Sequence, residues 1–377
     1  MPYGRLVAYG ATAWLILSPP RSASALPQDS LSFRTVSAGA THTCALTTGE
    51  QAYCWGDNLD GELGSGDRFD ATVPTPVSGG IRFLAIDASV GFTCGLATTG
   101  EAYCWGRNDT YALGNGAMRR SNIPVLVTGG QMFRAVAAGG DHACGVAVDG
   151  AAYCWGSNQE GQLGTGDTSS SPLPLPVAGS LRFLSITAGD DHTCALTVDS
   201  LAYCWGSNGR GQLGTGRRDR SLTPQPVAYH RHWRSLSAGA RHTCGIAIDD
   251  RPTAYCWGDN FHGQSAPSGY RTLWAPTFVG DGYNLLRVSA GRWHTCYVWG
   301  RSLNTVTCVG ANFDRQLGAN VYGRYVRVSA GDAHTCGLVE TGEVYCWGRN
   351  ASGQLGDGTH LRQERPVRVS NPLALAP

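Results

Sequence analysis

Short stretches of alternating apolar and polar residues recur along the chain, separated by turn residues. One unit begins with an apolar segment at 82–86, passes a step of small residues and continues into a second segment at 92–96. An Ala-Tyr-Cys-Trp segment follows a glycine turn. Next come a loop of the form Asn-x-x-Gly-Gln-Leu-Gly, as at 158–164, and a Pro-x-Pro-Val segment, as at 174–177. This pattern predicts four short strands per unit.

The unit is repeated seven times, and two cysteines mark every copy. The first cysteine recurs every 50 residues for four steps, then after 52 and after 40. A fixed period of this size indicates a solenoid or a propeller. Four strands per unit and seven units predict an all-β, seven-bladed β-propeller with four-stranded blades. Units 5 and 6 depart from the pattern.

The two ends of the chain indicate how the ring closes. Residues 31–36 resemble the last strand of a unit, and the chain stops soon after the segment 366–369. We therefore expect residues 31–36 to complete the seventh blade, which would remove an open sheet edge. The expected organisation is a signal peptide at 1–25 and a single propeller at 26–377.

The spacing of the cysteines predicts disulfide bonds within blades. Nine residues separate the two cysteines in five units and eleven in the other two. In a hairpin, an odd number places the flanking residues directly opposite each other, within reach of a disulfide. Reduced core cysteines are the alternative, and the spacing does not fit a zinc knuckle. The expected pairs are Cys44–Cys54, Cys94–Cys104, Cys144–Cys154, Cys194–Cys204, Cys244–Cys256, Cys296–Cys308 and Cys336–Cys346.

Composition and the N-terminus predict an exported protein, with a membrane-anchored or disordered N-terminus as the alternative. Arg5, an apolar run over 6–17 and Ala23-Ser24-Ala25 form the pattern of a cleaved export signal. Cleavage near Ala25 removes two arginines and no acidic residue, so the formal charge falls from +1 to −1. A nearly neutral chain without a basic tail does not favour nucleic-acid binding. No later apolar run is long enough to span a membrane, and we expect a secreted or periplasmic monomer.

Taken together, the His-Thr-Cys-Ala-Leu, Tyr-Cys-Trp-Gly, Asn-x-x-Gly-Gln-Leu-Gly and Pro-x-Pro-Val motifs resemble the regulator of chromosome condensation repeat. The resemblance covers nearly all of residues 31–370. It implies a seven-bladed propeller with the His-Thr-Cys strand toward the inside. It also implies guanine-nucleotide exchange on a small GTPase, but the export signal, the paired cysteines and the missing basic tail depart from that branch. The sequence looks more like a secreted bacterial branch, which includes a propeller that covers and inhibits β-lactamase.

Three kinds of residue recur at fixed positions in the repeat. A histidine ring around the axis is a candidate metal site, although one histidine per blade is also typical of hydrogen bonding to neighbouring backbone. The asparagines are expected to shape turns and the tryptophans to fill the core between blades. The histidines are His42, His142, His192, His242, His294 and His334, with Phe92 in the second unit. The asparagines are Asn58, Asn108, Asn158, Asn208, Asn260, Asn312 and Asn350.

Function is expected where the repeats differ. The first such region is the connector after Gln-Leu-Gly, which would place arginines around one rim, with a solvated rim as the alternative. The second is units 5 and 6, where aromatic residues collect; drift in a degenerate blade is the alternative. Arginine and aromatic residues are typical of protein interfaces. The candidate partner-binding residues are Arg68, Arg119, Arg120, Arg217, Arg218, Arg220, Tyr270, Trp274 and Trp293.

We find no catalytic motif in the sequence: no Gly-x-Ser-x-Gly elbow, phosphate loop or His-Glu-x-x-His. The first hypothesis is therefore an exported, disulfide-stabilised propeller that binds a protein on one loop face, without a cofactor. The alternatives are a carbohydrate binder or enzyme with its site at the channel mouth, and an exchange factor.

Overall fold

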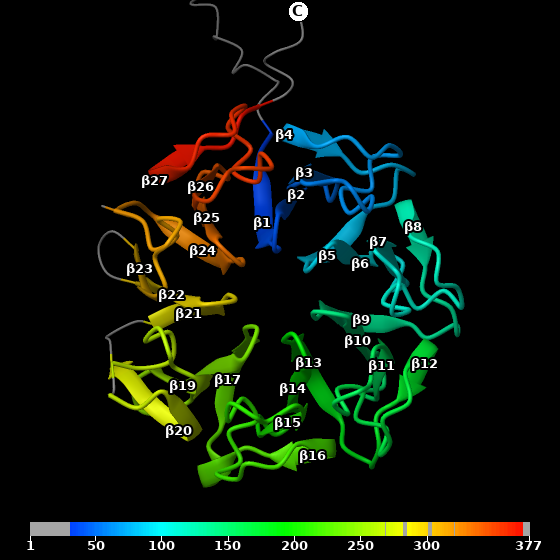
Figure 1. Ribbon diagram of the computed structural model, residues 1–377, viewed down its shortest axis with the longest axis vertical. Coiled ribbons are helices and arrows are strands. Elements are labelled where there is room, and N and C mark those ends of the chain that lie inside the picture. The colour runs from blue at the N-terminus through cyan, green and yellow to red at the C-terminus, as the bar shows by residue number, and fades with distance from the viewer. Residues whose placement is uncertain (1–30, 268, 282–284, 301–303, 320, 372–377) are drawn as a thin grey trace, which may run out of the picture.

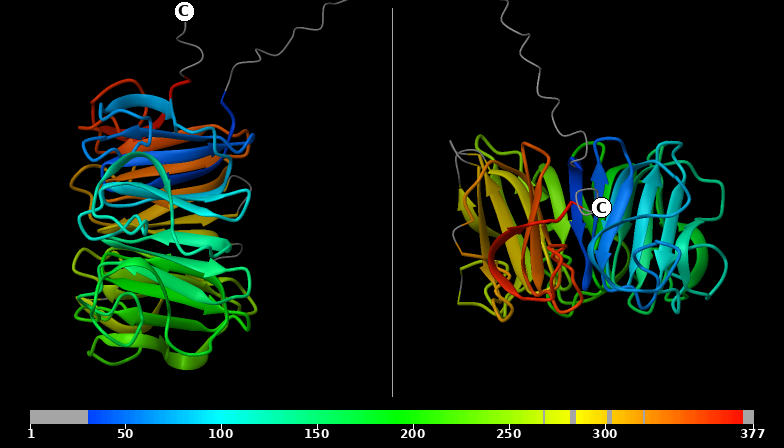
Figure 2. Two further views of the ribbon diagram at one scale, coloured as in Figure 1. Left: turned by 90° about the vertical axis from the view of Figure 1, so that its right-hand side faces the viewer. Right: turned by 90° about the horizontal axis from the view of Figure 1, so that it is seen from above.

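The fold is described from a computed structural model of the 377-residue chain. It describes residues 31–267, 269–281, 285–300, 304–319 and 321–371; the expected signal peptide lies outside these residues. Seven antiparallel sheets surround a central axis (Figure 1), and the molecule is a flat disc when seen from the side (Figure 2). The protein is therefore an all-β, seven-bladed propeller, as the repeat predicts.

Each blade begins with a strand beside the axis and continues outward strand by strand (Figure 1). The first strands are β1 (Phe33–Ala38), β5 (Phe83–Ala88), β9 (Phe133–Ala138), β13 (Phe183–Ala188), β17 (Trp233–Ala238), β21 (Leu285–Ala290) and β24 (Tyr325–Ala330). The second strands are β2 (His42–Thr47), β6 (Phe92–Ala97), β10 (His142–Ala147), β14 (His192–Thr197), β18 (His242–Ala247), β22 (His294–Trp299) and β25 (His334–Val339).

The outer half of each blade carries the third and fourth strands. The third strands are β3 (Ala52–Gly56), β7 (Ala102–Gly106), β11 (Ala152–Gly156), β15 (Ala202–Gly206), β19 (Thr253–Asp259), β23 (Thr305–Gly310) and β26 (Val344–Gly348). The fourth strands are β4 (Ala71–Pro76), β8 (Ser121–Leu126), β12 (Ser171–Pro176), β16 (Ser221–Pro226), β20 (Thr272–Asp281) and β27 (Gln363–Arg368). Blade 6 has three strands among its described residues, β21, β22 and β23. A 3₁₀ turn, η1 (Ala228–His230), precedes β17.

The expected closure by the N-terminal strand is wrong. Strand β1 pairs with β2 and is the first strand of blade 1, while blade 7 contains four strands of its own. Blade 7 therefore has no vacancy to fill. Blades 1 and 7 are instead joined side by side: Phe33 N donates to Gly342 O at 2.8 Å, and Ala38 N donates to Ser329 Oγ at 2.9 Å.

The hydrophobic core lies between neighbouring blades. Six tryptophans at the end of the third strand, such as Trp55, are completely buried. Each packs beside the aromatic residue that opens the first strand of its own blade; the ring centroids of Phe83 and Trp105, for example, lie 5.8 Å apart. In blade 6, Val309 takes the tryptophan position. Because each cluster combines residues of two blades, burial of apolar surface holds the ring together.

The cysteines of each pair lie directly opposite each other on the second and third strands, as in Cys44 and Cys54. All seven pairs form disulfide bonds, with Cα atoms 4.0–4.1 Å apart. That separation is near that of a narrow, non-hydrogen-bonded pair of antiparallel residues. The odd spacing in the sequence therefore predicts the observed register.

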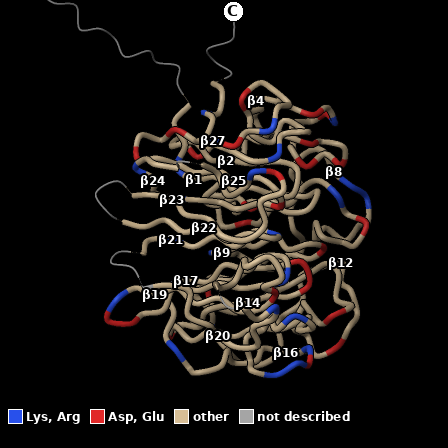
Figure 3. The backbone as a smooth tube through the Cα atoms, turned by 60° about the vertical axis from the view of Figure 1, so that its left-hand side comes forward, with Lys and Arg blue, Asp and Glu red and all other residues tan. Residues whose placement is uncertain are grey.

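The disc has two different faces. The loop face carries the turn after each first strand and the long loop after each third strand, for example 39–41 and 57–70 in blade 1. The opposite, hairpin face carries the turns between second and third strands, for example 48–51. Acidic and basic residues are interspersed over the loops and do not separate into two regions (Figure 3).

No helix among the described residues is both long and apolar enough to cross a bilayer.

Candidate functional site

The recurring histidines join neighbouring blades at six of the seven blade interfaces. His42 Nε2 lies 2.8 Å from Thr93 Oγ1 of the following blade, and Thr93 Oγ1 donates to Glu62 O at 3.0 Å. Trp105 Nε1 donates to the same carbonyl at 2.9 Å. The corresponding histidine–threonine pairs are His142–Thr193, His192–Thr243, His242–Thr295, His294–Thr335 and His334–Thr43. The last of these closes the ring.

This geometry fixes the protonation state of the histidines. Because the threonine hydroxyl gives its single proton to a carbonyl, the histidine Nε2 must carry a proton and donate to the hydroxyl. Nδ1 is buried without a partner in all six residues. Burial lowers the pKa of His42, His192, His242, His294 and His334 to about 3 and that of His142 to about 4. The histidines are therefore neutral connectors between blades. Among the described residues, no group of three or more His, Cys, Asp or Glu is arranged to hold a metal ion.

The recurring asparagines shape the loops on the loop face. Asn58 Oδ1 accepts a hydrogen bond from Leu63 N at 3.1 Å, and Asn58 Nδ2 donates to Phe69 O at 3.1 Å. The side chain thus ties the two halves of the loop together. Asn312 of blade 6 keeps the first bond but is exposed, because the second half of its loop is missing.

The structure places the predicted rim arginines on the loop face and ties several of them to neighbouring side chains. Arg120 pairs with Asp60 at 2.6 Å, and Arg220 pairs with Glu160 at 3.7 Å, in both cases on the preceding blade. The Arg218 guanidinium lies 5.2 Å from the Trp274 ring centroid. Arg68, Arg119 and Arg217 are exposed on the same rim. The rim is therefore a mixture of ion pairs and open arginines.

An aromatic cluster lies on the loop face of blades 5 and 6. His262 is at its centre, with ring centroids 5.0 Å from Phe261, 5.7 Å from Trp293 and 5.4 Å from Phe313. Phe313 is 71% and Phe261 is 55% exposed. The Arg271 guanidinium lies 4.8 Å from the Phe261 ring, next to the exposed Tyr270. We call Phe261, His262, Trp293 and Phe313 the aromatic cluster.

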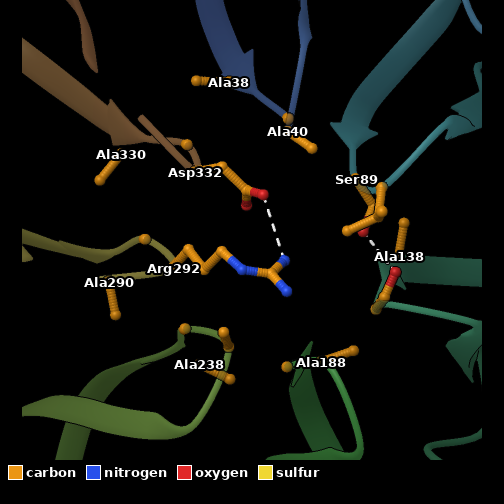
Figure 4. A pocket seen from close by; sticks show the side chains of 18 of the residues that line it. Ala38, Ala40, Ser89, Ala138, Ala188, Ala238, Ala290, Arg292, Ala330 and Asp332 are labelled. Carbon is orange, nitrogen blue, oxygen red and sulfur yellow. Dashed lines mark hydrogen bonds and ion pairs between the residues drawn. The ribbon is translucent and has the colours of Figure 1, made fainter. Parts of the chain in front are cut away.

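The cluster is connected to the mouth of the central channel through Arg292, which lines the mouth and lies 5.7 Å from the Trp293 ring centroid. Figure 4 shows the mouth. Arg292, next to Trp293, extends across the mouth and pairs with Asp332 at 3.1 Å and with Asp190 at 3.5 Å. Burial raises the pKa of Asp332 to about 6 and also raises that of Asp190, although Arg292 opposes both shifts. The mouth encloses about 160 Å³ and is lined mainly by Ala, Gly and Ser. Arg292 thus links blades 4, 6 and 7 across the axis.

The three predicted aromatic residues, Tyr270, Trp274 and Trp293, do not form one cluster in the structure. Trp293 belongs to the aromatic cluster, whereas Trp274 lies at the rim and contacts Arg218. Sequence reasoning missed Phe313, Arg292 and Asp332. The available signal was positional: Phe313 follows its repeat asparagine as Phe261 does, and Arg292 and Asp332 follow the glycine of the small-residue step.

The seven repeated sheets, their buried connectors between blades and their variable loops define a closed propeller of repeats. A model of the RCC1-like domain matches residues 5–322 of the chain. Models of the regulator of chromosome condensation (RCC1) repeat match residues 325–354 and 341–375. The chain belongs to the RCC1-like domain family.

Two of the curated relatives that match are much longer proteins. Human E3 ubiquitin-protein ligase HERC2 is 27% identical over 135 residues, which are 32% of this chain and 3% of that protein. Human probable E3 ubiquitin-protein ligase HERC6 is 32% identical over 127 residues, 27% of this chain and 12% of that protein. The chain therefore corresponds to a small part of these relatives.

Solved structures share the fold over most of the chain. Human WBSCR16 superposes with a TM-score of 0.76 at 18% identity, covering 85% of this chain and 94% of that one. Prp20p from Saccharomyces cerevisiae gives 0.74 at 19% identity, covering 91% and 88%. The ectodomain of the Arabidopsis thaliana receptor kinase ACR4 gives 0.59 at 21% identity, covering 91% and 99%. At these identities the likeness concerns the fold alone.

Proposed function

We propose that the protein is an exported, disulfide-stabilised binding module that holds a protein partner on its loop face, centred on the aromatic cluster. The observation that carries the proposal is the grouping of Trp293, Phe261 and the exposed Phe313 around His262. Aromatic anchors beside arginines are the side chains that contribute most to protein interfaces. The guanidinium groups of Arg271 and Arg292 lie 4.8 and 5.7 Å from the ring centroids of Phe261 and Trp293.

Support for the compartment comes from the cysteines. Seven disulfides account for all 14 cysteines of the chain. Such bonds persist in the periplasm or outside the cell. Together with the export signal expected at residues 1–25, they favour a periplasmic or secreted protein. A carbohydrate-binding or catalytic site at the channel mouth is the alternative to this proposal; the expected export signal disfavours the other alternative, an exchange factor.

The proposal is tested by capturing partners from the extracytoplasmic fraction with purified protein and with a Trp293→Ala, Phe313→Ala variant. We expect the wild type to retain one stoichiometric protein, and the variant to bind it about tenfold more weakly or worse, as for loss of interface anchors. Phe69→Ala is the matched control, because Phe69 is an exposed aromatic residue of the same face, on blade 1. Equal retention by all three proteins would exclude the aromatic cluster as the binding site.

A further inference from the structure

Blade 6 ends in an open strand edge. In the other six blades a fourth strand pairs with the third, but no described strand pairs with the outer edge of β23. Twelve residues separate Gly64 from Val77 in blade 1, whereas two separate Gly318 from Val321 in blade 6. Blade 6 therefore lacks a segment of the length that forms the fourth strand elsewhere.

The residues on both sides of this deletion keep their places. Gly318 packs against the indole of Trp347 as Gly64 packs against that of Trp105. A Cβ atom at Gly318 or at Gly64 would lie only 2.8 or 2.7 Å from the indole nitrogen, so neither position has room for a side chain. Val321 is buried, and its carbonyl accepts a hydrogen bond from Val306 N at 3.4 Å. The contact with blade 7 is thus maintained, and only the outer strand is missing.

The open edge presents unpaired backbone groups at a defined place. At the hairpin end of blade 1, Thr47 N donates to Gln51 O, so Thr47 and Gln51 form a hydrogen-bonded pair. Hydrogen-bonded and non-hydrogen-bonded pairs alternate along the two strands from there, and Cys44–Cys54 is a non-hydrogen-bonded pair. Cys308 holds the corresponding position in blade 6. Since a residue of such a pair directs its N–H and C=O away from its partner, those of Cys308 point to the open edge.

The other blade edges are protected against further pairing. In each fourth strand, one residue pairs with the second cysteine of the blade, and the residue directly before it is a proline. At this position the backbone N–H of any other residue would point away from the sheet, toward solvent. These prolines are Pro74, Pro124, Pro174, Pro224, Pro276 and Pro366. Proline at an edge strand prevents association with other strands. Strand β23, Thr-Val-Thr-Cys-Val-Gly, has neither proline nor charge and is rich in strand-forming residues.

A groove lies where the missing strand would pack against blade 7. It encloses about 680 Å³, and Tyr322, Tyr345, Val339 and Pro366 form its apolar part. Its lining also includes Arg365 and the ion pair of Arg324 with Glu340, 3.4 Å apart. Between blades 1 and 2, the equivalent of Tyr345 is Tyr103, which packs against the same hydrophobic cluster as Ala71 of β4, Val77 and Ile81. The groove thus has the aromatic wall on which a fourth strand rests elsewhere in the molecule.

We propose that the outer edge of β23 binds an extended, uncharged, proline-containing segment of another protein, which adds the fourth strand of blade 6. The segment runs antiparallel to β23 and pairs with the backbone of Cys308. Its proline lies one residue before that pair, and its side chains rest on Tyr322 and Tyr345. All six native fourth strands contain this proline, and four of them, β4, β8, β12 and β16, carry no charge. Strand addition at an open edge is an established way to bind peptides. This second site is separate from the aromatic cluster.

The probe is a labelled peptide with the sequence of residues 171–177, Ser-Pro-Leu-Pro-Leu-Pro-Val, taken from the fourth strand of blade 3. We expect saturable binding in fluorescence anisotropy, weakened about fivefold or more by Tyr322→Ser, as for loss of an aromatic anchor. Tyr229→Ser is the matched control, because Tyr229 and Tyr322 are 66% and 71% exposed and Tyr229 lies outside the groove. Unchanged binding by Tyr322→Ser, or no binding by the wild type, overturns the proposal.

A second variant fills the site. Replacing residues 319–320 by residues 65–76 of blade 1 restores the length of the missing strand. We expect this variant to fold, to lose peptide binding and to protect Cys308 from alkylation after mild reduction. Retained binding would place the peptide elsewhere and contradict the proposal.

Two further proteins separate this site from the other possibilities. A chain shortened after Asn371 should bind the peptide as the full chain does. Tighter binding by the shortened chain would show that residues 372–377 compete for the edge, and it would contradict the proposal that the edge binds another protein. The Trp293→Ala, Phe313→Ala variant should bind the peptide normally. Loss of binding in that variant would assign the peptide to the aromatic cluster instead, and it would also contradict this proposal.

Discussion

Phe92 and Ala143, on neighbouring blades, occupy the two positions that hold a histidine and a threonine at the other six blade interfaces. Both are completely buried and belong to one hydrophobic cluster. Where the imidazole is absent, the hydroxyl that would bond it is absent too. The carbonyl of Ala112 still accepts the bond from Trp155 Nε1, at 2.9 Å. The chain thus contains an apolar version of its own polar connector.

This exchange predicts energetic coupling at any polar interface. Thr243→Ala alone leaves the buried Nε2–H of His192 without an acceptor, and we expect it to destabilise the protein by about 1–3 kcal/mol. Adding His192→Phe removes the orphaned donor and recreates the Phe92–Ala143 arrangement. The double variant should therefore be more stable than the sum of the two single effects by about 1 kcal/mol or more. Denaturant unfolding of the four proteins gives the coupling energy, and simple additivity would contradict the prediction.

Acid should destabilise the protein because the six connecting histidines are buried neutral. Burial lowers their pKa from about 6.5 to about 3 or 4. Between these values the unfolded chain binds protons that the folded chain does not, so stability present above pH 6.5 is lost as the pH falls. Denaturation midpoints measured from pH 7 to pH 4 should fall steadily.

Buried carboxyl groups act in the opposite direction. Burial raises the pKa of Glu62 to about 8 and those of Asp87 and Asp332 to about 6, and it also raises those of Asp190 and Asp191. The histidines prevail because there are six of them and each shift is large. The His192→Phe, Thr243→Ala variant should show a weaker pH dependence than the wild type; an identical one would exclude His192 as a contributor.

Glu62 should be replaceable with a gain in stability. Its side chain accepts a hydrogen bond from Asp60 N at 2.9 Å, as Gln162 does from Glu160 N at 2.9 Å. Because burial raises the pKa of Glu62 to about 8, its stabilising contribution is lost as the pH rises from about 4.5 through 8. Glu62→Gln should stabilise the protein increasingly over this range, and thermal melts at pH 5, 7 and 9 test this. Gln162→Glu, the converse variant, should do the opposite.

The disulfide of blade 6 should be the first to be reduced. Thirteen cysteines are completely buried, whereas Cys308 is half-buried at the open edge of β23. Access governs attack by a thiolate. After limited reduction and alkylation, mass spectrometry should find the label on Cys296 and Cys308 before any other pair. Earlier labelling of a pair in another blade would contradict the role of the open edge.

The sequence allowed the strands, their register and the cysteine pairing to be predicted, because these depend on spacings within one unit. The odd number of residues between Cys44 and Cys54 is enough to place them opposite each other. The ring closure was predicted wrongly: residues 31–36 were assigned to blade 7, but residues 33–36 of this segment belong to the first strand of blade 1. The correct assignment requires knowing that blade 7 already has four strands of its own, which only the pairing of the strands shows. The candidate site was predicted in part: Trp293 is in the aromatic cluster, but Trp274 is not.

The repeat by itself determined the all-β architecture, the number of blades and the residues that build each blade, since local hydrogen bonding and alternation act over a few residues. Only the tertiary structure decided which loops become neighbours around the axis. It placed Phe313 against His262, stretched Arg292 between Asp190 and Asp332, and brought Tyr322 and Tyr345 together around one groove. These relationships depend on how neighbouring blades pack, so their physical cause is the closure of the ring. The missing fourth strand of blade 6, in contrast, is visible in the sequence as a deletion after Gly318.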